Sequence, residues 1–179
     1  EEMLQLCQQK DVGMVGAKLY YPDDTIQHAG VVVGLGGVAA HVLCKLPRDA
    51  EGYMGRLRCV QEISAVTAAC MMVKTSVFKA VGGFDEELKV AFNDIDLCMK
   101  VRKYGVKIVF TPYAELYHYE SKSRGMEDTP EKQLRFSREV NCFRRKWERE
   151  LLKGDPYYNP NLTLNNTDCS LRKQEKNGD

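Results

Sequence analysis

The chain has 179 residues, of which 44% are hydrophobic and 28% charged, values typical of a soluble globular protein with one domain. Its 26 Lys and Arg nearly balance its 25 Asp and Glu, which disfavours a general nucleic-acid binder, since such a protein has a clear basic excess. The longest apolar run, residues 31–40, contains three glycines and is too short for a membrane-spanning helix of roughly 20 residues.

The start of the chain and its cysteines indicate part of a longer protein in a reducing compartment. The chain opens on Glu1 rather than Met, shows no signal peptide, and leads directly into a helical pattern. Its seven cysteines are an odd number without a Cys-x-x-Cys pair, which disfavours a disulfide framework or a zinc cluster. Free thiols in apolar runs behave as small buried hydrophobes, so we expect structural cysteines.

The first half of the chain predicts more strand than helix. Residues 2–10 are typical of a short helix, and residues 12–20 of a strand. Residues 26–35, rich in β-branched side chains, predict a second strand. The polar residues 45–58, with Gly and Pro among them, predict a long loop. Residues 62–73 are small and apolar, a composition suited to a buried strand.

The second half begins with two helices. Residues 75–81 predict a short helix that ends at Gly82-Gly83, because glycine commonly follows a helix C-terminus. Residues 94–104 predict another helix, stopped by Gly105, and residues 106–110 predict a strand.

Residues 130–153 predict the longest helix. Thr129 is a suitable N-cap, and Pro130 occupies the first turn, where its missing N–H costs nothing. Apolar side chains recur at spacings of three and four, at Phe136, Val140, Phe143, Trp147 and Leu151. The opposite face mixes Arg with Glu, which favours a solvated face, with a membrane surface or a partner as the alternative. We place the domain at residues 1–154 and a partly disordered extension at 155–179.

Residues 31–39 (VVVGLGGVA) fit a strand followed by G-x-G-x-x-A, the fingerprint of dinucleotide binding. Such a turn delivers a diphosphate to the start of a helix. Pro47 and Gly52, however, interrupt the region where a helix and a second strand with its acidic residue should follow. A glycine-rich turn is therefore favoured, and a dinucleotide-binding oxidoreductase stays an alternative.

Asp94 and Asp96 lie two positions apart at the start of a predicted helix. They cannot share a helix face, so we expect them to have different roles. On the residues alone, the favoured interpretation is that one caps the helix and the other interacts with its positive end. The functional alternative is that a carboxylate at the helix start, next to a small-residue strand, is a general base, because the helix end favours the ionised form that accepts a proton.

His118 follows a predicted strand and precedes a polar loop at residues 121–128, a place from which side chains reach a site. A lone histidine is more often hydrogen-bonded than metal-bound. His28 and His41 have no neighbours at ligand spacing, so we regard both as structural.

Five segments of the chain form an ordered set: residues 66–73 (VTAACMMV), 78–85 (FKAVGGFD), 93–98 (NDIDLC), 118–121 (HYES) with Arg124-Gly125, and 155–162 (DPYYNPNL). In this order they resemble the C-terminal half of glycosyltransferase family 2. The resemblance is to bacterial members that build cell-surface polysaccharides and are described as rhamnosyltransferase-like, and it extends over roughly residues 12–172.

The resemblance implies an α/β chain with the GT-A fold, in which helices flank a mixed, mostly parallel sheet. It also implies an enzyme that transfers a sugar with inversion, from a UDP- or dTDP-sugar to a hydroxyl of a glycan or lipid-linked acceptor. Asp94 then matches the catalytic base, and Asn93 replaces the family's Glu. His118 matches a position that in some members completes the shell of a divalent metal, Mn²⁺ or Mg²⁺. The expected pocket for acceptor and donor sugar comprises Thr67, Ala68, Ala69, Phe84, Asp85, Asn93 and Asp96.

The family's first half carries the nucleotide-binding strand and an Asp-x-Asp metal motif, and neither precedes Glu1. We therefore expect a fragment with the acceptor side and the base, inactive by itself, whose metal binding needs the missing motif. The expected location is the cytoplasm, with the inner face of the cell membrane as a refinement. The first alternative is a non-catalytic module derived from this fold that binds a glycan or a protein.

Overall fold

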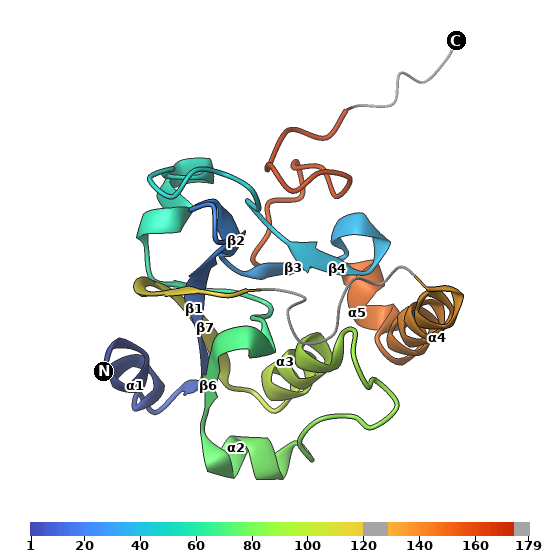
Figure 1. The fold of residues 1–179 in the computed structure, drawn as a ribbon. Helices are drawn as coiled ribbons and strands as arrows, with labels where there is room; N and C mark the ends of the chain where they lie inside the picture. The colour runs from blue at the N-terminus through green and yellow to red at the C-terminus, as the bar shows by residue number, and fades with distance from the viewer. Residues whose placement is uncertain (120–128, 174–179) are drawn as a thin grey trace.

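The computed structural model describes residues 1–119 and 129–173, in which short helices and strands form a mixed α/β fold, as the sequence predicts (Figure 1). The α-helices are α1 (Glu2–Cys7), α2 (Thr75–Ala80), α3 (Asn93–Lys103), α4 (Pro130–Lys146) and α5 (Glu148–Lys153). The strands are β1 (Val12–Tyr20), β2 (Ile26–His28), β3 (Val31–Val33), β4 (Ala39–His41), β5 (Gln61–Glu62), β6 (Met71–Val73) and β7 (Lys107–Tyr117). Short 3₁₀ helices are η1 (Leu35–Gly37), η2 (Tyr53–Arg58) and η3 (Ala68–Cys70). A helix with the length and apolarity of a membrane span is not found among the described residues.

Strand β1 is the centre of the main sheet, and all nine of its residues are buried. It pairs in parallel with β7 along one edge and antiparallel with β6 and β2 along the other. Strand β5 continues the sheet antiparallel to β7. The sheet is mixed as predicted, but parallel pairing is confined, among the described strands, to β1 with β7. Strand β2 is antiparallel because the chain returns from β1 through a tight turn.

The predicted strand at 26–35 is wrong, because the chain turns at Gly30, whose φ is 106°. Strands β2 and β3 therefore belong to different sheets, and β3 forms a hairpin with β4. The glycine-rich segment between β3 and β4 is the short turn η1. A dinucleotide-binding unit needs a long helix and a parallel strand after the glycines. An antiparallel strand follows instead, so the structure contradicts the dinucleotide alternative.

The predicted strand at 62–73 is also wrong, since it divides into β5, the turn η3 and β6. The Thr67 hydroxyl accepts a hydrogen bond from Ala69 N at 3.3 Å and so caps η3. Strand β7 extends well beyond the predicted residues 106–110, and the predicted loop at 45–58 contains η2. The helices expected at 75–81 and 94–104 are confirmed as α2 and α3.

The helix expected at 130–153 is confirmed, but it breaks into α4 and α5 at Trp147, where φ is −115° and ψ is 24°. The Thr129 hydroxyl caps α4 by accepting from Lys132 N at 3.4 Å. Helix α3 lies between the sheet and α4 (Figure 1). Of the predicted apolar stripe, Phe143 and Trp147 are buried, whereas Phe136 is 44% exposed.

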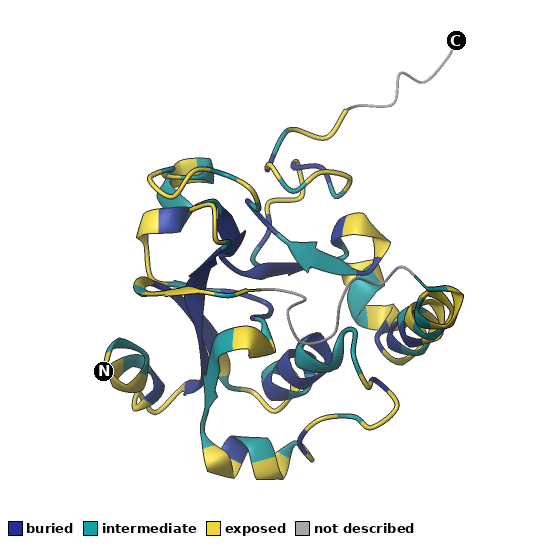
Figure 2. Cartoon of the chain, in the orientation of Figure 1, coloured by how far each residue is buried: buried dark blue, intermediate teal, exposed yellow. Residues whose placement is uncertain are grey.

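One large hydrophobic core fills the space between the sheet, α3 and α4, and buried residues follow β1, β3 and one side of α3 (Figure 2). Tyr158, Leu162 and Cys169 belong to this same core. The Asp155 carboxylate accepts from Val33 N at 2.8 Å and from the Ser64 hydroxyl at 2.6 Å. The boundary at 154 stays a prediction, although residues 155–173 pack on the main core. The end of the predicted extension, residues 174–179, lies outside the described residues.

Gly16 in β1 permits a close contact with Val66 in this core. A Cβ added at Gly16 would lie 2.3 Å from Cγ1 of Val66. Gly16→Ala is therefore expected to destabilise the protein by about 1–3 kcal/mol, as overpacking does. Val66→Ala removes the clashing methyl groups, so the double variant should be more stable than the sum of the two single changes. Urea unfolding followed by circular dichroism gives the free energy of unfolding of the two single variants and the double variant. Strictly additive changes in that free energy would contradict the contact.

Candidate active site

Asp94 lies in the first turn of α3, half-buried, with both carboxylate oxygens bonded to backbone N–H groups. Oδ2 accepts from Ala68 N at 3.0 Å, and Oδ1 accepts from Ile95 N at 2.9 Å. These bonds join the start of η3 to the start of α3. The two bonds hold the carboxylate in one orientation at the start of the helix. Each oxygen keeps acceptor capacity for a substrate hydroxyl.

The structure places Thr67, Ala68 and Ala69 next to Asp94, and Asn93 adjoins it at the first position of α3. Their role in a sugar pocket stays a prediction. Thr67 also lines a cavity of about 330 Å³. The ends of β1 and β7 meet at this cavity, because Tyr21 and His118 follow those strands and both line it. In α/β sheets, ligands bind at the carboxyl ends of parallel strands.

His118 lies on the wall of the same cavity, at the end of β7. Its Nδ1 forms a hydrogen bond of 2.8 Å with Oε1 of Gln27, so Nε2 is the nitrogen left for a ligand. Across residues 1–119 and 129–173, no three His, Cys, Asp or Glu side chains are grouped so as to hold a metal ion. One imidazole does not make a site for Mn²⁺ or Mg²⁺, which prefer oxygen ligands. The described residues therefore do not by themselves fit the predicted metal.

His28 supports this wall from inside the core, a role that the sequence does not predict. Its side chain is fully buried, and its Nε2 lies 3.4 Å from Thr67 N. Nε2 of His28 accepts from that N–H, and its Nδ1 lies 3.2 Å from Nδ1 of His41, which in turn lies 3.1 Å from the Gln27 carbonyl oxygen. Burial, and to a smaller extent His41, hold the pKa of His28 well below its usual value. The sequence does not predict these contacts, because His28 and His41 have no spacing pattern that would indicate that they meet.

Asp96 points into the contact between α3 and α4. Its side chain has no exposed surface, and Oδ1 accepts from the Trp147 indole at 2.8 Å. Lys146 reaches Oδ1 at 2.8 Å, and Lys100 reaches Oδ2 at 3.3 Å. A carboxylate buried in this way presents nothing to a substrate. We therefore correct its predicted place in the pocket and assign it to holding α4 on α3, which agrees with the different roles expected for the two aspartates.

Phe84 and Asp85 lie in the loop between α2 and α3. The Phe84 ring packs edge-on against Phe78, with centroids 5.7 Å apart, and is 46% exposed. Asp85 pairs with the Lys146 ammonium at 2.5 Å, and this contact holds the pKa of Asp85 below its usual value. Within the described part of the chain, neither residue forms a hydrogen bond or an ion pair with Asp94. Their role on the acceptor side stays a prediction.

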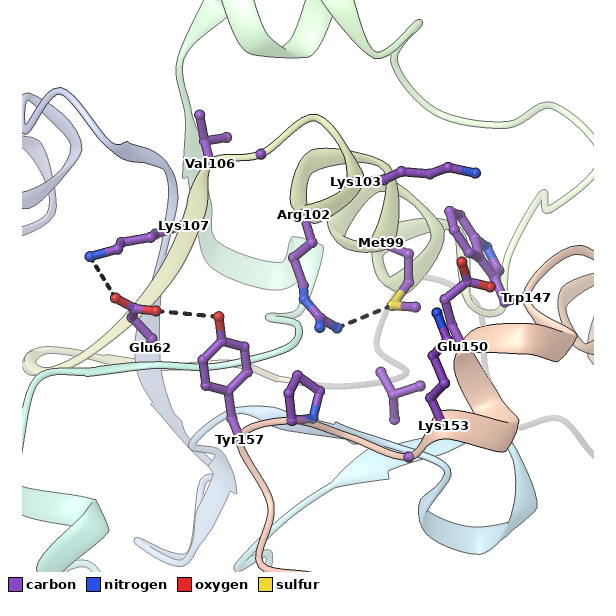
Figure 3. Close-up of a pocket in the computed structure, with 14 residues that line it drawn as sticks. Glu62, Met99, Arg102, Lys103, Val106, Lys107, Trp147, Glu150, Lys153 and Tyr157 are labelled. Atoms are coloured by element: carbon purple, nitrogen blue, oxygen red, sulfur yellow. Dashed lines mark hydrogen bonds and ion pairs between the residues drawn. The ribbon is translucent and has the colours of Figure 1, made fainter.

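A second cavity, of about 640 Å³, lies at the opposite end of α3 (Figure 3). Arg102 there donates to the Ser64 hydroxyl at 3.0 Å and lies 5.5 Å from the Tyr157 ring centre, while Lys107 pairs with Glu62 at 2.7 Å. Arg102 is eight residues from Asp94, about 12 Å along the helix axis. The cavity adjoins the start of β7 rather than its carboxyl end. Because it contains no predicted site residue and its main cations have internal partners, Asp94 remains the candidate centre.

A mixed α/β fold with a carboxylate at a helix start, beside a cavity at the carboxyl ends of two parallel strands, is the architecture expected of a GT-A glycosyltransferase domain. The chain belongs to glycosyltransferase family 2, because the model of the family described as "Glycosyltransferase like family 2" matches residues 1–139. The family predicted from the five motifs is thus confirmed, and with it the α/β fold in which helices flank a mixed sheet.

Three curated relatives extend this finding. The chain is 58% identical over 171 residues (95% of the chain) to "Uncharacterized protein y4gI" of Sinorhizobium fredii, and 38% identical over 180 residues (100% of the chain) to "O-antigen biosynthesis protein RfbC" of Myxococcus xanthus. It spans only 19% and 14% of those proteins. It is also 36% identical over 62 residues, 35% of the chain, to 20% of the "N-acetylglucosaminyl-diphospho-decaprenol L-rhamnosyltransferase" of Mycobacterium tuberculosis. No solved structure matches.

The low pKa of His28 makes stability depend on pH. The unfolded chain protonates a histidine near pH 6.5, whereas the folded protein keeps His28 neutral to lower pH. The unfolded state therefore binds more protons below about pH 6.5, and the free energy of unfolding should decrease as the pH falls. His28→Asn should flatten this decrease in urea unfolding measured between pH 8 and pH 5.5. An unchanged slope in the variant would contradict the assignment.

Proposed function

We propose that this chain is the acceptor-side part of the catalytic domain of an inverting glycosyltransferase in surface-polysaccharide synthesis. The observation that carries the proposal is the Asp94 carboxylate, half-buried and held by two backbone N–H groups at the start of α3. Membership of glycosyltransferase family 2 supports it. The printed names of two relatives, an O-antigen biosynthesis protein and a rhamnosyltransferase, support the place in polysaccharide synthesis.

In the proposed reaction, Asp94 removes the proton of an acceptor hydroxyl while that oxygen attacks the anomeric carbon of the donor sugar. The new bond joins the acceptor oxygen to the anomeric carbon, and the bond from that carbon to the nucleoside diphosphate breaks. The diphosphate leaves from the opposite face, so the configuration inverts. The two N–H bonds fix the carboxylate in one orientation, which contributes through positioning.

The proposed donor is a UDP- or dTDP-sugar, and the proposed acceptor is a glycan or a lipid-linked sugar. The cavity between Thr67 and His118 is a suitable place for the transferred sugar, because it adjoins the peptide that binds Asp94. Dependence on Mn²⁺ or Mg²⁺ stays part of the proposal, with ligands supplied from outside the described residues.

We further propose that the protein acts in the cytoplasm, at the inner face of the cell membrane. Four arginines on α4 and α5 are exposed: Arg138, Arg144, Arg145 and Arg149. Cationic side chains on a helix surface are attracted to anionic lipids. Contact with that surface would bring the site to a lipid-linked acceptor. The near-neutral net charge continues to disfavour nucleic acid as a partner.

Replacing Asp94 with Asn tests the proposed base. Asn keeps an oxygen that accepts from Ala68 N but does not take up a proton, so transfer should fall about 10²- to 10⁴-fold while folding is unchanged. The assay follows sugar transfer from UDP- and dTDP-sugars by the full-length protein. Asp168→Asn, an exposed carboxylate bonded to Ser170, is the matched control and should retain activity. Full turnover by Asp94→Asn would refute the base, and absence of turnover in the unaltered protein would favour the non-catalytic module.

A further inference from the structure

Glu139, in the middle of α4, is a buried carboxylate that binds three consecutive backbone N–H groups. Only 3% of the residue is exposed. Oε1 accepts from Lys89 N at 3.0 Å and Val90 N at 3.1 Å, and Oε2 accepts from Ala91 N at 2.9 Å. Successive N–H groups that converge in this way form a concave anion site, here filled by the protein's own side chain. Charge-assisted bonds of this kind are about twice as strong as neutral ones.

The next residue, Phe92, ties the same segment to α4 by packing. Its ring centre lies 5.8 Å from that of Phe136 and 5.4 Å from that of Phe143. Its φ is 63°, a left-handed conformation that a bulky residue adopts only when the surroundings enforce it. The carbonyl of Phe92 accepts the first helical bond of α3, from Asp96 N at 2.8 Å. The start of α3 is therefore placed by contacts with α4.

We propose that Glu139 is a positioning residue, which orients Asp94 for proton removal by fixing residues 89–92 on α4. The inference rests on the proposed function, because it takes Asp94 as the base. Glu139 itself touches the backbone of the loop and not the Asp94 carboxylate. It acts through the chain, since Ala91 is three residues from Asp94 and Phe92 only two.

If Glu139 only stabilised the fold, its replacement would destabilise the whole protein. The structure favours a local effect instead. The segment is only partly buried: Lys89 is exposed, while Val90 and Ala91 are half-buried. Water can therefore replace the lost acceptor, and the fold should survive. What is lost is the fixed backbone at 89–92 and the support for the strained Phe92. A displacement of about 1 Å at a reacting group is enough to slow a reaction about a hundredfold.

The test compares Glu139→Gln with Glu131→Gln, a change at an exposed glutamate in the first turn of the same helix. Gln has the shape of Glu, but its amide group offers N–H donors to a place that needs an acceptor. Hydrogen exchange of the free protein should become faster at residues 89–94 in Glu139→Gln alone, and stay unchanged in the rest of α3. In the transfer assay, kcat should fall about 10- to 100-fold, with the KM for the nucleotide-sugar changed less than about twofold.

Three results would overturn the proposal: unchanged exchange at residues 89–94, equally faster exchange throughout α3 and β1, or faster local exchange with full kcat. The first shows that the carboxylate does not hold the loop, and the second shows a general loss of stability. The third shows that the loop does not control the reaction. Failure of the proposed function appears separately, as full turnover by Asp94→Asn, whatever the exchange of residues 89–94.

Discussion

The contact between α3 and α4 depends on two buried carboxylates, and the geometry of the candidate site depends on that contact. Asp96 binds the Trp147 indole, and Glu139 binds three N–H groups of the loop before α3. A carboxylate out of water is costly unless it is paired or hydrogen-bonded, and Asp96 has both Lys146 and Lys100 as partners. A shift of helix α4 would therefore break the hydrogen bonds of both carboxylates. The start of α3 and α4 behave as one unit.

This constraint explains how two aspartates in one turn serve different purposes. Asp96 faces α4, where its carboxylate pairs with Lys146. Asp94 instead faces η3, where it accepts from Ala68 N. The carboxyl ends of β1 and β7 place His118 on the same side, and His28 supports Thr67 from beneath. The cavity with Arg102 lies at the far end of α3. Its position near the start of β7 and its internally paired cations distinguish it from the Asp94 site.

The sequence predicts those elements of the structure that are determined by residues close together in the chain. Strand β1, helices α2 and α3, and the Thr129 cap follow from runs, glycines and capping residues that neighbour one another in sequence. The predicted bounds are wrong where contacts between residues far apart in the sequence determine the backbone conformation. Gly30 turns a continuous β-branched run into two strands of different sheets. The periodic helix breaks at Trp147, whose indole donates to Asp96 in another helix. The pairing of Glu139 with residues 89–91 spans about fifty positions, so no spacing rule reveals it. The role of Asp94 as a base is predicted only by the family resemblance, because the local sequence pattern favours a helix cap.

Substrates bound at the proposed site would cover the turn that holds Asp94. Hydrogen exchange of the full-length protein, with and without a saturating UDP- or dTDP-sugar and its acceptor, measures where they bind. We expect slower exchange at residues 67–69 and 93–95 when substrates are bound. Protection confined to residues 99–107 and 153–157, around the Arg102 cavity, would contradict this expectation.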